Sequence, residues 1–454
     1  MTADGATGAA PPRRQRSARL LGATSLAHFL NDGVAFFVPV VGDLLSQERH
    51  MSTLVVTAML TTFYVVSATF GIGVGLVADA IGRRGTMMAV GIATLGISLL
   101  GFYASLVSAG APADALVLVA AAVAGAGSSF YHPLGGSVLQ LGYPAGSRGK
   151  ALGINGAAGS LGRALYPALF FVIAALGISK AATTIVFAVL SLLAAVIVGF
   201  GLPKEVNHPA GARPHPSTPA GTGPVAGTGA ARTVVPAGEA GPASHRGRRV
   251  QGAPLRSLLS RSVVALMSIS FLRSVAFIGV VSWVPIYLTT QRHAGLSTSL
   301  GWTVTVMYAG GIAGQPVFGL LADRFDKRFV LALDSLGSAA GIFVFLSTSG
   351  TGAAALMALA MFGLFTFSGF PLLLSLVADY VPKSSSTTGN ALVWGVGSTG
   401  GQAIGPLAVG LLTGGADANL GAAFAVLGAL AAATVLATPL LERTSRSTRV
   451  ALLG

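Results

Sequence analysis

Two ionisable side chains lie within the first long apolar stretch of the chain, at a spacing that suits proton transfer. His28 and Asp32 are four residues apart within the run 20–43, so a helix would carry both on one face. An ionisable residue at the centre of a membrane span costs roughly 2.5–3.5 kcal/mol, and such residues normally face the protein interior or a water-filled cavity. A carboxylate balanced between burial and a nearby arginine can exchange protons. We therefore predict proton or substrate handling at this pair, with a fixed ion pair or a helix-packing contact as the alternative.

Two arginines lie midway along other apolar stretches, and their chemistry suits an anion. Arg163 occurs in the run 159–167, and Arg273 is followed at helical spacing by Phe277. A guanidinium binds a carboxylate, phosphate or phosphonate through two parallel hydrogen bonds. We predict that Arg163 either binds substrate or only neutralises Asp32. Arg273 has no obvious acidic partner in the second half of the chain, which favours contact with substrate.

One further histidine and several other polar residues are also candidates. His132 precedes Pro133, which bends a helix and frees a backbone carbonyl; a structural histidine is the first interpretation and a proton relay the second. Asp334 and Asp379 lie near predicted helix ends, where capping accounts for them. Trp283 suits either a cavity wall or an anchor at the membrane interface. The weaker cavity candidates are Asn31, Tyr131, Asn155, Tyr308, Gln315 and Gln402.

The composition of the chain decides which elements must position these residues. Of 454 residues, 53% are hydrophobic and 9% are charged, whereas a soluble globular chain is roughly 25% charged. This argues strongly against a water-soluble enzyme. A run of about 20 apolar residues crosses a bilayer as a helix, whereas a membrane barrel alternates in segments of about ten. We predict an all-α membrane protein with twelve spans, at 20–43, 53–77, 86–107, 114–137, 150–176, 181–202, 262–288, 298–321, 329–348, 352–378, 387–413 and 419–440.

The spans form two groups of six, separated by a stretch that cannot bury a core. This stretch is rich in Pro, Gly, Ala, Ser and Thr, as in a flexible linker. In loops on the predicted outer side, the only lysine and arginine residues are Arg49, Lys180 and Arg292. By the positive-inside rule, both termini and the linker face the cytoplasm of a protein in the cell inner (plasma) membrane. The predicted units are a basic tail at 1–19, bundles at 20–202 and 261–441, the linker at 203–260 and a tail at 442–454.

The two predicted bundles resemble each other in sequence. Residues 75–84, GLVADAIGRR, match residues 319–328, GLLADRFDKR, at an offset of 244 (319 − 75). Gly162 in the fifth span matches Gly401 in the eleventh at an offset of 239 (401 − 162). Several such pairs at a nearly constant offset indicate a duplicated unit. Duplicated units are how secondary transporters build two halves around a site at the membrane midplane.

The loop GLVADAIGRR, with its second copy, resembles the signature loop of the major facilitator superfamily. Within that superfamily, SLAHFLND at 25–32 and GAGSSFYHP at 125–133 are similar to the fosmidomycin-resistance branch. The resemblance implies two six-helix bundles, a central cavity lined by the first, fourth, seventh and tenth spans, and export of drugs or metabolites. That branch often carries a glutamate after His-Pro, whereas this chain has Leu134. A carboxylate that would carry protons there is therefore missing.

The signature loops are predicted to act as gates at the inner face. Glycines let helices approach closely, an aspartate caps a helix end or pairs with an arginine, and the arginines hold the loop at the interface. The second copy has Asp326 where the first has Gly82, so the first is the better candidate. A tight turn that carries only a topology signal is the alternative. The predicted gating residues are Gly75, Asp79, Gly82, Arg83, Arg84, Gly319, Asp323, Arg324 and Arg328.

Together these observations predict a secondary active transporter that works by alternating access and is not an enzyme. We expect proton-coupled export of a small anionic or polar organic solute or drug. The alternatives are a proton-coupled or facilitative importer of an organic anion and a non-transporting membrane sensor. The chain has no cysteine, Walker loop or metal-ligand spacing, so we expect neither a cofactor nor a metal ion. The expected partners of a monomer are the solute, protons and the bilayer, and not nucleic acid.

Overall fold

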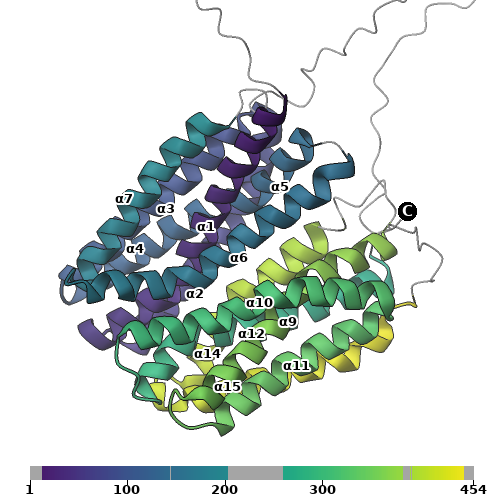
Figure 1. Cartoon of the computed structure of the whole chain (residues 1–454). Helices are drawn as coiled ribbons and strands as arrows, with labels where there is room; N and C mark the ends of the chain where they lie inside the picture. Colours follow the sequence, from purple (N-terminus) through teal and green to yellow (C-terminus); the bar gives the residue numbers. More distant parts are fainter. Residues whose placement is uncertain (1–12, 144, 203–258, 382–388, 390, 444–454) are drawn as a thin grey trace, which may run out of the picture.

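The computed structural model describes residues 13–443 except 144, 203–258, 382–388 and 390, and every regular element in this part of the chain is a helix (Figure 1). Most of the predicted linker and tails therefore lies outside the described residues. The first bundle contains α1 (Arg13–Arg49), α2 (Thr53–Ile81), α3 (Arg84–Val107), α4 (Ala111–Ser128), α5 (Tyr131–Gly142), α6 (Ala145–Ala175) and α7 (Lys180–Gly201). The second contains α9 (Arg261–Thr290), α10 (Thr298–Arg324), α11 (Lys327–Ser347), α12 (Ala353–Tyr380), the π-helix η3 (Ala391–Thr399), α14 (Gly400–Thr413), the short 3-10 helix η4 (Asp417–Asn419), α15 (Leu420–Ala433) and the 3-10 helix η5 (Thr434–Leu440).

Twelve helical spans can be followed through the described residues, and this confirms the predicted fold class. The purple-to-teal helices of Figure 1 form one bundle and the green-to-yellow helices form the other. Ten of the described helices are long and apolar enough to cross a membrane, and Ala353–Gly369 in α12 is a shorter apolar segment. The eleventh span starts as the π-helix η3 and continues as α14.

The fourth span, predicted as one run over 114–137, is broken into α4 and α5. Pro133 has no N–H with which to continue the helical ladder to Ser129. Just before this point, the N–H of Phe130 bonds to the carbonyl oxygen of Gly127, three residues back, at 3.3 Å. Helix α5 then starts at Tyr131, so that His132 lies in its first turn.

Close helix crossings recur in the two bundles at the offsets of the sequence repeat. A Cβ added at Gly125 of α4 would clash with the carbonyl oxygen of Phe63 in α2. A Cβ added at Gly363 of α12 would clash in the same way with the carbonyl oxygen of Met307 in α10. The offsets are 238 (363 − 125) and 244 (307 − 63). The same backbone contact is therefore built twice, as a duplicated unit requires.

A second repeated crossing positions α6 against α1 and carries a prediction. A Cβ at Gly162 of α6 would clash with the carbonyl oxygen of Phe29 in α1, and Gly401 of α14 approaches Phe271 of α9 in the same way. We expect Gly162→Ala to lower the free energy of unfolding by about 1–3 kcal/mol, because overpacking pushes the two backbones apart. Thermal unfolding in detergent measures the change.

Gly156→Ala on the same helix is the matched control. No heavy atom lies within 4 Å of a Cβ added at Gly156, and alanine is the better helix former. Its melting temperature should equal or exceed that of the parent protein. Equal melting temperatures for Gly156→Ala and Gly162→Ala would contradict the close crossing.

The two bundles contact each other in one half of their length. We call the end where α7 stops and α9 starts the linker end, and the opposite one the far end. Between the bundles, Tyr308 donates to the Phe36 carbonyl oxygen at 3.2 Å and Thr305 to the Ala164 carbonyl oxygen at 2.5 Å. The residues that form these two hydrogen bonds lie in the halves of α1, α6 and α10 that are nearer the far end. A cavity of about 350 Å³ lies between α6 and α10 on the linker side, lined by Gly153, Ala157, Ser160, Ile312, Gln315 and Pro316.

Candidate functional site

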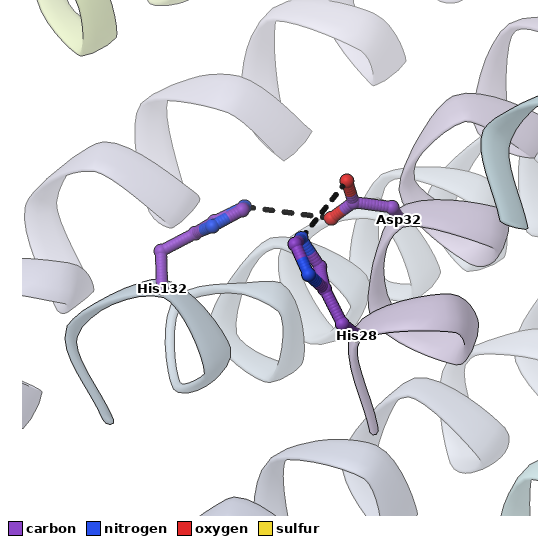
Figure 2. A group of neighbouring side chains, drawn as sticks. All are labelled: His28, Asp32 and His132. Carbon is purple, nitrogen blue, oxygen red and sulfur yellow. Dashed lines mark ion pairs between the residues drawn. The ribbon is translucent and has the colours of Figure 1, made fainter. Parts of the chain in front are cut away.

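A polar cluster surrounds the buried Asp32 near the middle of α1, and we call His28, Asp32, His132 and Arg163 the Asp32 cluster. Asp32 is 1% exposed, and its Oδ2 lies 2.5 Å from Nη1 of Arg163 and 3.3 Å from Nε2 of His28. Its Oδ1 lies 3.5 Å from Nε2 of His132 and accepts a hydrogen bond from the Asn31 side chain at 3.0 Å. Figure 2 shows both histidine rings directed at this carboxylate. One carboxylate is thus shared by three basic groups from α1, α5 and α6.

Three features of the sequence bring these side chains together. The four-residue spacing places His28 and Asp32 on one face of α1, as predicted. Gly159 of α6 leaves room for the His28 ring, with which an added Cβ would clash, so α6 can bring Arg163 up to α1. The break before α5 turns His132 toward the same carboxylate. The side chain of His132 is 54% exposed and is the most accessible of the cluster.

The contacts of His28 fix the orientation of its ring. Its Nδ1 lies 2.8 Å from the backbone carbonyl oxygen of Asn155, and a carbonyl oxygen only accepts, so Nδ1 carries a hydrogen. Its Nε2 lies 3.3 Å from Oδ2 of Asp32. The ring is thus held between the backbone of α6 and the carboxylate of Asp32.

Tyr131 and Asn155, two of the weaker candidates, contact His28 and hold its ring in place. The Tyr131 hydroxyl donates to the side-chain oxygen of Asn155 at 2.7 Å. The Tyr131 ring stacks on the His28 ring, with 4.4 Å between the ring centroids. Both residues are buried and contact the imidazole, and neither lines the cavity between α6 and α10.

The Asp32 cluster also has the spacing of a metal site. The ligand atoms of His28, Asp32 and His132 all lie within 4.8 Å of one another, and two imidazoles with a carboxylate are ligands that transition metals accept. Arg163, however, occupies one oxygen of Asp32, and its fixed positive charge repels a second cation. The chemistry of the cluster therefore favours protons over a metal ion.

Arg163 connects the Asp32 cluster to the cavity between the bundles. Its Nη2 donates to Oγ of Ser160 at 2.8 Å, and Ser160 lines the cavity. The guanidinium carbon lies 5.3 Å from the ring centroids of Phe36 and of Phe367, one from each bundle. In this arrangement Arg163 neutralises Asp32 and lies beside the cavity between the bundles.

Arg273, the second predicted substrate contact, has an acidic partner. Its Nη2 donates to Oδ2 of Asp334 in α11, and Asp334 is completely buried. The expectation that Arg273 lacks an acidic partner is wrong. The capping role expected for Asp334 is also wrong, because Asp334 lies about two turns into α11. Gly369 of α12 leaves room for the pair, since an added Cβ would lie 2.5 Å from Nη1 of Arg273. Contact of Arg273 with a substrate stays a prediction.

Gln315 and Gln402 differ in their position. Gln315 lines the cavity between α6 and α10, where a polar side chain can contact a solute. Gln402 donates to Oγ of Ser398 in its own span at 3.2 Å and does not line that cavity.

Asp379, for which the sequence predicts a capping role, pairs with a residue of another helix. It accepts a hydrogen bond from Nζ of Lys327 at 2.6 Å, so it joins α12 to α11 and does not cap a helix.

Two predicted aromatic candidates are interior residues. Trp283 of α9 is completely buried, so it is not an anchor at the membrane interface, and it does not line the cavity between α6 and α10. Tyr308 of α10 is 1% exposed and holds Phe36 of the other bundle through its hydroxyl. Its place is at the contact between the bundles and not in the open cavity.

The first signature loop forms the turn between α2 and α3. Gly82 has a φ of 68°, and its N–H bonds to the carbonyl oxygen of Ala78, which is the left-handed C-cap that glycine favours. Arg83 precedes α3 as its N-cap residue, and Arg84 is the first residue of that helix. Glycine is required here by the turn itself.

The predicted close helix contact at the signature glycines does not occur in this arrangement. No heavy atom lies within 4 Å of a Cβ added at Gly75 or Gly319. Both glycines lie toward the linker end, where the bundles are apart in this conformation. The side chains of Asp79 and Asp323 lie outside the described residues.

The second signature loop is fixed by its own ion pair. Asp326 caps α11, because its Oδ1 accepts the N–H of Arg328 at 2.9 Å and its Oδ2 accepts Nη2 of Arg328 at 2.7 Å. These hydrogen bonds hold the pKa of the Asp326 carboxyl below its usual value. Arg328 also donates to the Leu441 carbonyl oxygen at 3.1 Å. Arg324 ends α10 and is exposed.

Some residues that join the two bundles are not among the candidates that the sequence indicates. Asp43 of α1 is completely buried, and its Oδ1 lies at hydrogen-bond distance, 2.5 Å, from Oγ1 of Thr289 in α9. Phe36 of α1 and Phe367 of α12 meet edge to face, with 5.9 Å between their ring centroids. Such contacts depend on how the two bundles face each other, for which the sequence of one chain carries no signal.

Comparison with known proteins matches most of the chain to one family. The family model for the Major Facilitator Superfamily matches residues 24–400 and 297–452. A putative metabolite transport protein of Haemophilus influenzae is 29% identical over 154 residues, 34% of this chain and 36% of that protein. An uncharacterized protein of Archaeoglobus fulgidus is 31% identical over 141 residues, 31% of this chain and 64% of that protein. The chain thus matches less than two thirds of the length of either relative.

Solved structures share the fold over nearly the whole chain. The inward-open xylose transporter XylE from E. coli has a TM-score of 0.69 at 13% identity, with 95% of this chain and 98% of that chain covered. The nucleoside transporter NupG has a TM-score of 0.68 at 11% identity, with 93% and 100% covered. An inward-facing, unoccupied bacterial homologue of the human lysosomal transporter Spinster has 0.64 at 15%, with 95% and 96% covered.

Structural likeness at these identities establishes the fold alone, and the fosmidomycin-resistance branch stays a prediction. The family model supplies the classification, since it covers all the spans that the sequence predicts apart from the first residues of the first. The chain belongs to the major facilitator superfamily.

Proposed function

We propose that this multi-pass membrane protein is a secondary transporter that moves a small anionic or polar organic solute with proton coupling, by alternating access. Family membership and the apolar helices support a transporter and not an enzyme. The names of the similar proteins refer to metabolite, xylose and nucleoside transport. The observation that carries the proposal is the position of Arg163, which neutralises Asp32 at 2.5 Å and adjoins the cavity between the bundles.

The charges of the Asp32 cluster support a link between proton and solute. Arg163 and His28 both face the carboxylate of Asp32. When Asp32 takes up a proton, Arg163 loses its anionic partner, and its guanidinium is free to bind a carboxylate, phosphate or phosphonate. When the anion leaves, Arg163 returns to Asp32 and the proton is released. The exposed edge of His132 offers the proton a path to water.

The direction of transport follows from whether proton and solute bind together. An anion held by Arg163 binds with the proton, and both then move the same way, which favours proton-coupled uptake. Because one proton and a singly charged anion together carry no net charge, the pH gradient drives this uptake, at about 1.4 kcal/mol for each pH unit. Export, as the branch resemblance implies, requires a polar drug that competes with the proton for Asp32. Flux in each direction across vesicles distinguishes the two.

The conformation fits one stage of such a cycle. The contacts between the bundles lie in the far half of the helices, and the cavity lies on the linker side. If the linker is cytoplasmic, as the loop charges predict, the described state faces inward. Placement in the inner (plasma) membrane, cytoplasmic termini and a monomeric state belong to the same proposal.

Arg163→Gln is expected to weaken the binding of an anionic solute by about 10- to 150-fold, because a hydrogen bond to a charged group contributes about 1.5–3 kcal/mol. Purified protein in liposomes is first given a panel of labelled phosphonates and carboxylates, with and without a pH gradient, to identify the solute. The concentration dependence of uptake then gives the apparent affinity. Arg163→Lys keeps the charge without the planar fork and should have an intermediate affinity.

Arg292→Gln is the matched control. Arg292 donates to the Phe345 carbonyl oxygen at 2.9 Å at the far end and does not line the cavity, so its loss should leave the affinity unchanged. An affinity unaffected by Arg163→Gln would exclude the anion site. A panel in which no solute moves protons would favour the non-transporting sensor.

A further inference from the structure

A second buried carboxyl, separate from the Asp32 cluster, lies where the bundles meet at the far end. Asp43 follows Asp32 by eleven residues on α1 (43 − 32), about three turns away, and its side chain is completely buried. Its Oδ1 lies 2.5 Å from Oγ1 of Thr289 in the other bundle. Its Oδ2 is buried and makes no hydrogen bond to any described residue. The transport cycle proposed above does not use this residue.

The surroundings of Thr289 are satisfied best by a neutral Asp43. Oγ1 of Thr289 lies 2.5 Å from the Asp43 oxygen and 3.0 Å from the carbonyl oxygen of Ile286. A protonated Asp43 donates to this hydroxyl, whose own hydrogen then reaches Ile286. An ionised Asp43 would accept one hydrogen bond and keep its second charged oxygen buried without a donor, which disfavours the ionised form.

The basic side chains at the far end are engaged elsewhere. Arg49 and Arg292 donate to backbone carbonyl oxygens in neighbouring turns of their own bundles. Lys180 of α7 pairs with Glu48 of α1 at 2.7 Å. Among the described residues, no Lys, Arg or His side chain forms an ion pair with Asp43. Nothing in this part of the chain therefore compensates a negative charge on it.

The other polar groups around Asp43 do not supply a positive charge either. His50 and His293 follow α1 and α9 and are exposed. The neighbouring charge is the carboxylate of Asp417 in η4, which accepts a hydrogen bond from Thr53 of α2 at 2.7 Å. A like charge opposes ionisation of Asp43 further. The closed far end thus holds the buried Asp43 carboxyl beside a second carboxyl and without a positive partner among the described residues.

We infer that Asp43 is a second proton-binding site, which is occupied when the far end is closed and emptied when the far end opens. The inference rests on the alternating access of the proposed function. Opening separates Asp43 from Thr289 and admits water, in which a carboxyl is ionised at neutral pH. Because the closed state holds one more proton than the open state, a higher pH favours opening by up to about tenfold per pH unit.

A single thiol can report opening, because the chain has no cysteine. Thr57 of α2 is 5% exposed and packs against Gly410 of α14 in the other bundle, so Thr57→Cys is expected to react only when the bundles separate. Maleimide labelling in nanodiscs is measured at two pH values about two units apart. Each rate is divided by that of Leu176→Cys, an exposed position between α6 and α7, to cancel the pH dependence of the reagent.

We expect this ratio to rise about tenfold or more from pH ~5.5 to pH ~7.5 while Asp43 is intact. With Asp43→Asn it should stay constant, because the amide donates to Thr289 at any pH. Glu48→Gln is the matched control on the same helix and should keep the pH dependence.

A pH dependence that survives Asp43→Asn would overturn the inference. If the pH dependence of labelling were then lost in Asp32→Asn, the titrating group would lie in the Asp32 cluster, and the proposed transport cycle would not be contradicted. Thr57→Cys that stays unlabelled at every pH, with the solute present, would contradict alternating access and this inference with it.

Discussion

Asp32→Asn is expected to separate solute movement from the proton gradient. The amide fills the same space as the carboxyl but does not exchange a proton, and it no longer neutralises Arg163. A gradient of one pH unit supports about tenfold solute accumulation for each coupled proton. In liposomes the variant should let the solute equilibrate, so that this ratio falls to about one. Accumulation of the labelled solute under an imposed pH gradient measures the effect.

Asp379→Asn is the matched control for this experiment. Asp379 pairs with Lys327 at the linker end, outside the Asp32 cluster, and its loss should leave the accumulation ratio intact. Size-exclusion chromatography checks that both variants fold. We expect Asp32→Asn to fold because Arg163 adjoins the cavity, where water can solvate its charge once Asp32 is replaced by a neutral residue. If Asp32→Asn still accumulated solute in response to a pH gradient, another residue would carry the coupling.

The helices and part of the Asp32 cluster could be predicted because their determinants are local. Each span is a long apolar run, which the bilayer thickness makes recognisable. His28 and Asp32 share a face whatever the tertiary structure, since helical geometry alone fixes it. Gly162 and Gly401 occur at the repeat offset because the same crossing is built in each bundle. His132, by contrast, reaches Asp32 only because of the break between α4 and α5. Pro133 predicts that break but not the direction in which the His132 side chain then points.

The ion pairs between helices could not be predicted from the sequence. Arg273 and Asp334 are 61 residues apart and lie on α9 and α11. Their meeting depends on how each helix is rotated about its axis, and in a membrane the protein-facing and lipid-facing sides are similarly apolar. The period of the sequence therefore does not fix the rotation. Asp43 and Thr289 present the same difficulty, because they lie on different bundles and meet where the two bundles are in contact.

Removal of one partner of the pair Arg273–Asp334 is expected to be severely destabilising. Arg273 is 10% exposed and Asp334 is completely buried, so either residue alone would leave an uncompensated buried charge. We expect Arg273→Met and Asp334→Leu each to lower the free energy of unfolding by about 3–5 kcal/mol, and the double variant to recover most of that loss. Chemical unfolding of the four proteins in detergent gives the coupling energy as a double-mutant cycle.

Asp326→Asn is the control, because Asp326 pairs with Arg328 at 39% exposure, and exposed pairs contribute about 0–1 kcal/mol. If the losses in free energy of unfolding of the two single variants added up in the double variant, the unpaired buried charge would not be the cause of destabilisation. The folded double variant also tests the substrate contact predicted for Arg273. If its solute affinity equals that of the parent protein, Arg273 holds α9 against α11. If its affinity falls while its stability is restored, Arg273 reaches the solute after releasing Asp334, and the second bundle then supplies an arginine to the site as Arg163 does from the first.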